Sequence, residues 1–138
     1  MPRILCIDYG KKRTGIAVTD PLKIIAAPLM AIETPALMQF LKNYFKDQEV
    51  ELVLIGDPKN WDETDTHATP LVNQFVQRFK KEFPSKDIKM IDERYTSKLA
   101  VDAMVAMGMK KKDRQKKENV DQIAATIMLQ EYLNVPHS

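Results

Sequence analysis

A short stretch near the N-terminus, from Asp8 to Gly15, constrains the fold of this chain more than any other feature of its sequence. The apolar run Ile4–Ile7 ends in the carboxylate of Asp8, and a basic turn then leads into a second apolar run, Ile16–Val18. This pattern predicts two neighbouring strands joined by a tight turn. It holds one carboxylate in a fixed position at the edge of a sheet.

The turn between these strands carries the three basic residues Lys11, Lys12 and Arg13. They place positive charge where a bound anion would lie. The flanking glycines, Gly10 and Gly15, would let a bulky ligand approach the backbone closely. We therefore expect the turn to contact phosphate groups.

Length and composition indicate one globular domain, because the chain has 138 residues, of which 44% are apolar and 29% charged. No apolar run approaches the roughly 20 residues needed to cross a bilayer, and the N-terminus lacks a basic signal-type lead. We expect a cytoplasmic protein without membrane contact. The single cysteine, Cys6, is expected to pack in the core, and with only His67 and His137 beside it a zinc site is not supported.

Three short strands are expected first, over about residues 3–8, 14–19 and 23–32, as an antiparallel meander. Pro28 interrupts the third strand and cannot donate a hydrogen bond to a neighbour on one side. Proline is tolerated at the edge of a sheet, so this strand is predicted to be an edge strand.

Helices and strands alternate in the rest of the chain. Thr34 is expected to cap a helix that has Pro35 at its first position. The elements expected after it are a buried strand over residues 51–56, a helix starting near His67 to Pro70, a strand over residues 88–92, a short helix from Thr96 to Gly108, and a last helix over residues 119–133. Strands that alternate with helices are parallel, so an α/β mixed sheet with helices on both faces is predicted.

Carboxylates gather where the expected strands end, which is the natural crevice for a ligand in such a sheet. Asp8 closes the first strand, Asp57 follows the fourth, and Asp92 and Glu93 close the last. Neighbouring residues of a strand point to opposite faces, so Asp92 and Glu93 cannot both face Asp8. Asp121 lies in the first turn of the last helix, where small residues would let the helix lie close to the sheet.

Two or three converging carboxylates without cysteine or histidine suit a hard divalent cation such as Mg²⁺. Two such ions about 3.5–4 Å apart can activate a water and stabilise the leaving oxygen in phosphodiester cleavage. Each acid also has a purely structural alternative. Asp8 could start a turn, Asp121 could complement its helix dipole, and Asp92 or Glu93 could pair with Arg94.

Basic residues cluster again at Arg78, Lys80 and Lys81, and in a longer run before the last helix. A run of this kind is usually a solvated loop, but beside the acids it would hold backbone phosphates. The residues of the longer run are Lys110, Lys111, Lys112, Arg114, Lys116 and Lys117.

Three separated motifs resemble the YqgF (RuvX) family: Asp8–Asp20, Asp92–Ser97 and Val120–Gln130. The resemblance covers essentially the whole chain. It implies an RNase H-like fold, akin to Holliday-junction resolvases, with a five-stranded mixed sheet in the order third, second, first, fourth and fifth strand. It also implies a cytoplasmic bacterial nuclease that processes the 5′ end of pre-16S ribosomal RNA.

The resemblance carries three catalytic and metal-binding acids onto this chain: Asp8, Glu93 and Asp121. It prefers Glu93 to Asp92, a choice that strand geometry leaves open. Mg²⁺ or Mn²⁺ is the expected cofactor, and Arg94 joins the basic residues expected to contact nucleic acid.

The loop after the fourth expected strand departs from the family pattern. That pattern is Gly-[Leu/Tyr]-Pro-x-Asn, where x is any residue, and a further glycine follows it. Here Asp57 replaces the apolar residue and Glu63 stands where the glycine would be. Asp57 could join the acid cluster, although an orientation toward solvent is the stronger expectation.

The leading functional hypothesis is a metal-dependent endonuclease acting on structured RNA, with ribosomal precursor particles as possible partners. A resolvase of branched DNA is the first alternative, and it would need a homodimer rather than a monomer because a four-way junction requires two symmetric sites. The others are a non-catalytic RNA-binding assembly factor and, last, an actin-like ATPase, which needs two such domains. The sequence shows no base-reading element that separates RNA from DNA.

Overall fold

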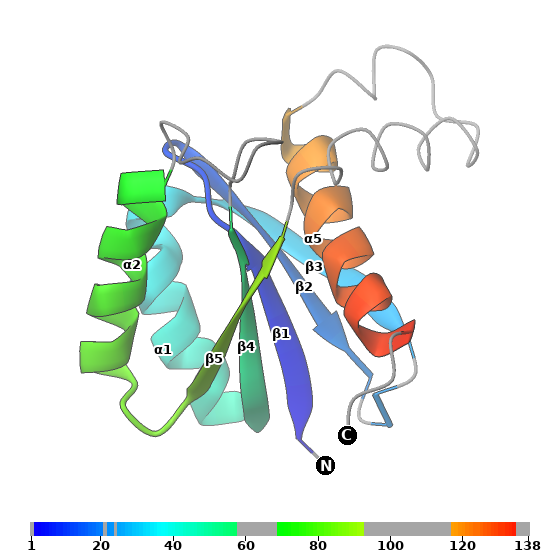
Figure 1. Ribbon diagram of the computed structural model, residues 1–138. Coiled ribbons are helices and arrows are strands. Elements are labelled where there is room, and N and C mark those ends of the chain that lie inside the picture. The colour runs from blue at the N-terminus through cyan, green and yellow to red at the C-terminus, as the bar shows by residue number, and fades with distance from the viewer. Residues whose placement is uncertain (1, 21, 24, 58–68, 93–116, 135–138) are drawn as a thin grey trace.

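The computed structural model describes residues 2–20, 22–23, 25–57, 69–92 and 117–134, with backbone only for residue 92 and residues 117–122 (Figure 1). The elements are, in chain order, β1 (Arg3–Asp8), β2 (Arg13–Thr19), β3 (Ala26–Glu33), the 3₁₀ turn η1 (Thr34–Ala36), α1 (Leu37–Asp47), β4 (Val50–Asp57), α2 (Thr69–Glu82), β5 (Asp87–Asp92) and α5 (Lys117–Asn134). The helix expected from Thr96 to Gly108 lies outside the described residues.

The five strands form one mixed sheet in the order β3-β2-β1-β4-β5, which confirms the predicted order. β1 pairs antiparallel with β2, and β2 pairs antiparallel with β3. β1 pairs parallel with β4, and β4 pairs parallel with β5. β1 is therefore the central strand, and its carboxyl end lies beside the carboxyl end of β4.

Pro28 lies in the edge strand β3, as predicted. Ile16 of β2 faces Met30, but the next residue, Ala17, faces Pro28. The skipped residue, Leu29, is the extra residue of a β-bulge. Since proline has no N–H to donate, the irregularity falls where the ladder is weakest.

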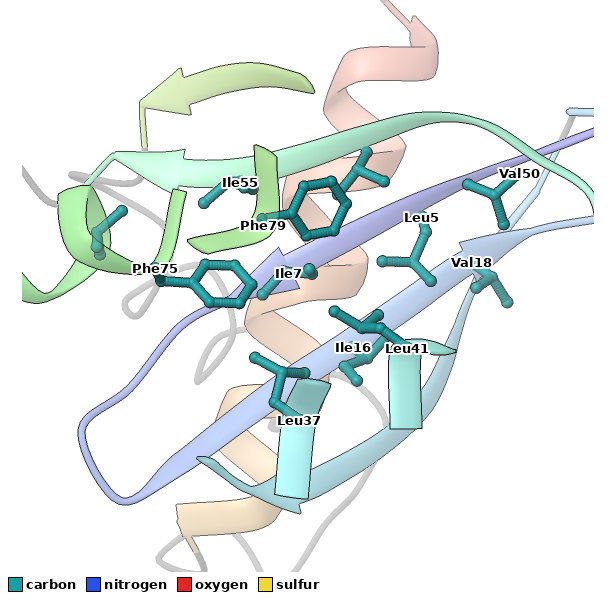
Figure 2. Close-up of a cluster of buried hydrophobic side chains, with 12 residues drawn as sticks. Leu5, Ile7, Ile16, Val18, Leu37, Leu41, Val50, Ile55, Phe75 and Phe79 are labelled. Carbon is teal, nitrogen blue, oxygen red and sulfur yellow. The ribbon is translucent and has the colours of Figure 1, made fainter. Parts of the chain in front are cut away.

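The larger core lies between the sheet and helices α1 and α2, which cover the same face (Figure 1). Figure 2 shows its side chains, with Phe75 and Phe79 reaching from α2 toward Leu5 and Ile7 of β1. The ring centroids of Phe75 and Phe79 are 6.0 Å apart, and Phe79 also lies 4.9 Å from Phe83. This face thus combines aliphatic side chains from the strands with aromatic rings from α2.

The smaller core lies between the other face and α5. The strand residues in it include Cys6 and Ala17, and the helix contributes Ala125 together with larger apolar side chains. Cys6 is fully buried, as expected of a core residue. Because Cys6, Ala17 and Ala125 are small, Cα atoms of α5 come within 8 Å of Cα atoms of β1, β2 and β3.

A side-chain hydrogen bond ties α5 to the edge of the sheet. The backbone N–H of Ala26, the first residue of β3, donates to Oε1 of Gln130 at 3.1 Å. This hydrogen bond anchors α5 to the edge strand β3, in addition to the apolar packing that holds the helix against the face of the sheet. Among the described helices, none combines the length and apolar character that a membrane span requires.

Candidate functional site

Asp8 is the last residue of the central strand β1 and is half-buried. Ile4 and Cys6 of the same strand pack in the core under α5. Since side chains alternate along a strand, Asp8 points to the α5 face of the sheet. Its partner in β2 is Gly15, so no β2 side chain competes with the Asp8 carboxylate at this register.

The backbone of Asp121 lies near the start of α5. Figure 1 shows this start at the same end of the sheet as the carboxyl ends of β1, β4 and β5. The fold therefore brings the backbone of Asp121 to the end and the face of the sheet that Asp8 occupies. Glu93 comes directly after β5 and lies outside the described residues.

A complete metal site cannot be read from the described side chains, among which no three histidine, cysteine or acidic residues cluster. Two of the three predicted ligands are Glu93 and the side chain of Asp121, neither of which is described. The assignment of Asp8, Glu93 and Asp121 as the catalytic and metal-binding set therefore stays a prediction.

Asp57 is the last residue of β4 and pairs with Asp92 across the parallel ladder. Val53 and Ile55, four and two residues earlier, pack in the α1/α2 core. Alternation along the strand therefore directs Asp57 to the face opposite Asp8. Asp57 is half-buried there, and it does not join an acid cluster with Asp8.

The loop between β1 and β2 is closed by a ring of hydrogen bonds. The Thr34 hydroxyl donates to the Gly10 carbonyl oxygen at 2.5 Å and lies 3.0 Å from the Thr14 hydroxyl. Because Thr34 uses its only hydroxyl hydrogen on Gly10, Thr14 donates to Thr34. The N–H of Gly10 lies 3.5 Å from the Thr14 oxygen, which completes the ring.

A further bond holds the tip of this loop. The backbone N–H of Thr34 donates to the carbonyl oxygen of Lys12 at 2.9 Å. Hydrogen bonds that polarise one another reinforce a network of this kind. The loop is therefore fixed in shape before any ligand arrives.

The prediction that Thr34 caps a helix with its side chain is wrong. The segment begins with the 3₁₀ turn η1, its N-cap is Glu33, and no side chain caps it. Thr34 is unavailable as a cap because its hydroxyl is bonded to Gly10. Pro35 does lie in the first turn, as expected.

Gly10 has a reason to be glycine that the sequence did not reveal. A Cβ atom at this position would lie 2.2 Å from the carbonyl oxygen of Arg13, closer than real Cβ atoms approach. The tight packing of the loop on itself thus requires glycine here. Close approach of a ligand to Gly10 and Gly15 stays a prediction.

The predicted nucleic-acid contacts fall into two groups. Lys11 and Lys12 are exposed on the β1–β2 loop, and Arg13 is the half-buried first residue of β2. Lys117 is the first residue of α5. The remaining ones lie outside the described residues, and they are Arg94, Lys110, Lys111, Lys112, Arg114 and Lys116.

Comparison with known proteins identifies the family. The family model described as RuvX, Holliday junction resolvase, matches residues 2–135. The chain belongs to the RuvX family. A RuvX relative from Christiangramia forsetii is 50% identical over 133 residues, covering 96% of this chain and 98% of that protein. A relative from Flavobacterium psychrophilum is 51% identical over 133 residues, with 96% and 97% covered. Both carry the name "Putative pre-16S rRNA nuclease".

Two of the solved structures similar to this RuvX chain are resolvases in complex with Holliday junctions. Thermus thermophilus RuvC in complex with a Holliday junction substrate gives a TM-score of 0.58 at 12% identity, with 96% of this chain and 94% of that chain covered. The Fowlpox virus resolvase with Holliday junction DNA gives 0.55 at 13% identity, with 95% and 96% covered. At such low identity the likeness concerns the fold, and it confirms the RNase H-like class.

Proposed function

We propose that this RuvX-family chain is a hydrolase, a divalent-metal-dependent endonuclease that processes the 5′ end of pre-16S ribosomal RNA. Support comes from relatives that carry the pre-16S nuclease name and match nearly the whole chain at about half identity. The observation that carries the proposal is the position of Asp8. Its carboxylate ends the central strand on the α5 face, at the end of the sheet where α5 begins.

The donor set suits Mg²⁺ or Mn²⁺, because both prefer carboxylate oxygens. Asp8, Glu93 and Asp121 would hold the ion. Asp92 ends β5, and Glu93 follows it directly in the sequence. The family resemblance is the reason for choosing Glu93 rather than Asp92. A bound ion would activate water and stabilise charge on the leaving oxygen.

Binding and positioning of the substrate would depend on the basic side chains of the protein. Lys11 and Lys12, exposed on a loop that a ring of hydrogen bonds holds in shape, would bind backbone phosphates of the substrate. A loop of defined shape would position the substrate relative to the carboxylate of Asp8. Positioning of the reacting groups accounts for a large part of catalysis. Arg94 and the basic residues between 110 and 117 would extend the contact. Processing of ribosomal RNA also supports a cytoplasmic location.

The experiment is cleavage of a precursor 16S RNA fragment in Mg²⁺ or Mn²⁺. Asp8→Asn is expected to lower the rate by about 10²-fold or more. Asp57→Asn is the matched control, because Asp57 ends a neighbouring strand at the same end of the sheet but faces the other side. We expect it to keep nearly the wild-type rate. Equal losses in both variants, or no loss in Asp8→Asn, would reject the proposal.

Cleavage of branched DNA is the second candidate, and the likeness to junction-bound resolvases favours it. A four-way junction needs two symmetric sites, so this function requires a homodimer. Side-by-side assays on precursor RNA and a four-way junction, with the mass in solution measured by light scattering, separate the two. Faster cleavage of the junction by a dimer would replace the RNA assignment.

A further inference from the structure

A recess of about 230 Å³ opens on the α1/α2 side of the sheet, opposite the face that Asp8 occupies. Its walls come from the β1–β2 loop, the start of α1 and the middle of α2. The volume is below the roughly 300–1,000 Å³ of pockets that hold whole small molecules. It therefore suits one planar group with an attached anion.

The floor of the recess is formed by apolar side chains. Leu37 and Phe75 in it are buried in the α1/α2 core, where Figure 2 shows both side chains. The ring of Tyr9 stacks on Phe75, with centroids 4.7 Å apart and planes at 23°. Met38 and Pro35 continue the apolar lining. Surfaces of this kind accept the flat face of a nucleobase, whatever its identity.

The rim of the recess is positively charged. Lys11 on the loop and Arg78 on α2 both line it and are both exposed. Among the described residues, no acidic side chain lines the recess, and neither cation forms an ion pair. An arginine with no competing carboxylate can bind a phosphate with two parallel hydrogen bonds.

The recess and Asp8 are joined by a single short loop. Thr34 lines the recess and also belongs to the hydrogen-bond ring that fixes this loop. Lys11 follows Asp8 by three residues and points its charge to the other side of the sheet. A nucleic-acid strand that crosses the loop would place one nucleotide on the recess side and a neighbouring phosphate on the Asp8 side.

We propose that the recess is a nucleotide subsite, which holds one unpaired nucleotide of the substrate with its base on the apolar floor and its phosphate between Lys11 and Arg78. A base can enter only when it leaves its pair and its stack, so the substrate class is nucleic acid with an unpaired nucleotide beside the cleaved bond. The inference rests on the proposed function for the choice of nucleic acid as ligand.

The test measures binding of wild-type protein without divalent metal, so that cleavage plays no part. The probes are an RNA duplex with one unpaired 2-aminopurine and the same duplex fully paired, followed by fluorescence anisotropy and base fluorescence. We expect the unpaired probe to bind about tenfold more tightly and its base fluorescence to be quenched on binding. Arg78→Gln should abolish this preference. Lys80→Gln, which removes an exposed charge from the same helix outside the recess, should keep it.

Equal binding of both probes, or equal losses in the two variants, would overturn the subsite. So would competition by free adenosine monophosphate at the concentration of the oligonucleotide, because the ligand would then be a free nucleotide. The binding test and the nuclease assay can fail independently of each other. Absence of cleavage with the preference intact rejects only the proposed nuclease, and cleavage without the preference rejects only the subsite.

Discussion

The two faces of the sheet are built from different side chains. The α5 face includes the small residues Cys6, Ala17 and Ala125, and the helix backbone lies close to the strands there. The α1/α2 face instead adds the aromatic rings of Phe75 and Phe79 to its aliphatic side chains. The difference in packing indicates that one face positions the candidate site and the other contributes more to stability. On the α5 face (the thin face), the start of a helix lies at the end of the sheet that Asp8 occupies. The α1/α2 face (the thick face) holds the larger of the two buried apolar clusters.

The strongest test of this comparison removes a ring from the thick face. Phe79 is fully buried and contacts the rings of Phe45, Phe75 and Phe83. Phe79→Ala is expected to lower the free energy of unfolding by about 3–5 kcal/mol, because transfer and cavity costs add. Urea denaturation measures this. The folded fraction at low temperature should still cleave RNA, and loss of activity without loss of stability would contradict the division of tasks.

The second test thickens the thin face. Ala125→Leu inserts a larger side chain at a position with no exposed surface, where α5 lies against the strands. Overpacking costs about 1–3 kcal/mol and pushes the helix from the sheet. We therefore expect nuclease activity to fall more than stability, the reverse of Phe79→Ala. Ala27→Leu, at an exposed position of β3, is the control and should change neither quantity.

The third and smallest test concerns the loop that joins the two faces. Thr34→Val keeps the shape of the side chain but removes the hydroxyl that bonds to Gly10 and Thr14. We expect a loss of about 1 kcal/mol in unfolding free energy and weaker RNA binding. Thr34→Ser, which restores the hydroxyl, should recover both. Recovery of stability alone would mean that the ring does not order the loop for binding.

Much of the fold could be predicted from the sequence because its signals are local. The period of the apolar residues marked the strands, and Pro28 placed β3 at the edge. The largest difference in a strand boundary is at β3, which begins at Ala26 rather than near Lys23. The carbonyl oxygen of Asp20 accepts the N–H of Lys23, and its carboxylate accepts the N–H of Ile25, so the turn is longer than the pattern suggests.

The site was less predictable because its contacts are distant in sequence. The capping rule applied to Thr34 considers only its near neighbours, but its hydroxyl bonds to Gly10, 24 residues earlier. The face of Asp57 was hidden because an uninterrupted apolar run gives no alternation to read. The residues that line the recess come from three separate segments of the sequence, so no single motif predicts it.

The irregular outer strand has a consequence for how copies of the chain behave when crowded. Strands exposed at a sheet border tend to recruit strands from other molecules, and proteins avoid this with prolines and bulges. β3 has both at one point, where Pro28 offers no donor and Leu29 is displaced from the ladder. Pairing of this edge strand with a strand from another molecule, the first step of fibre growth, is thereby disfavoured.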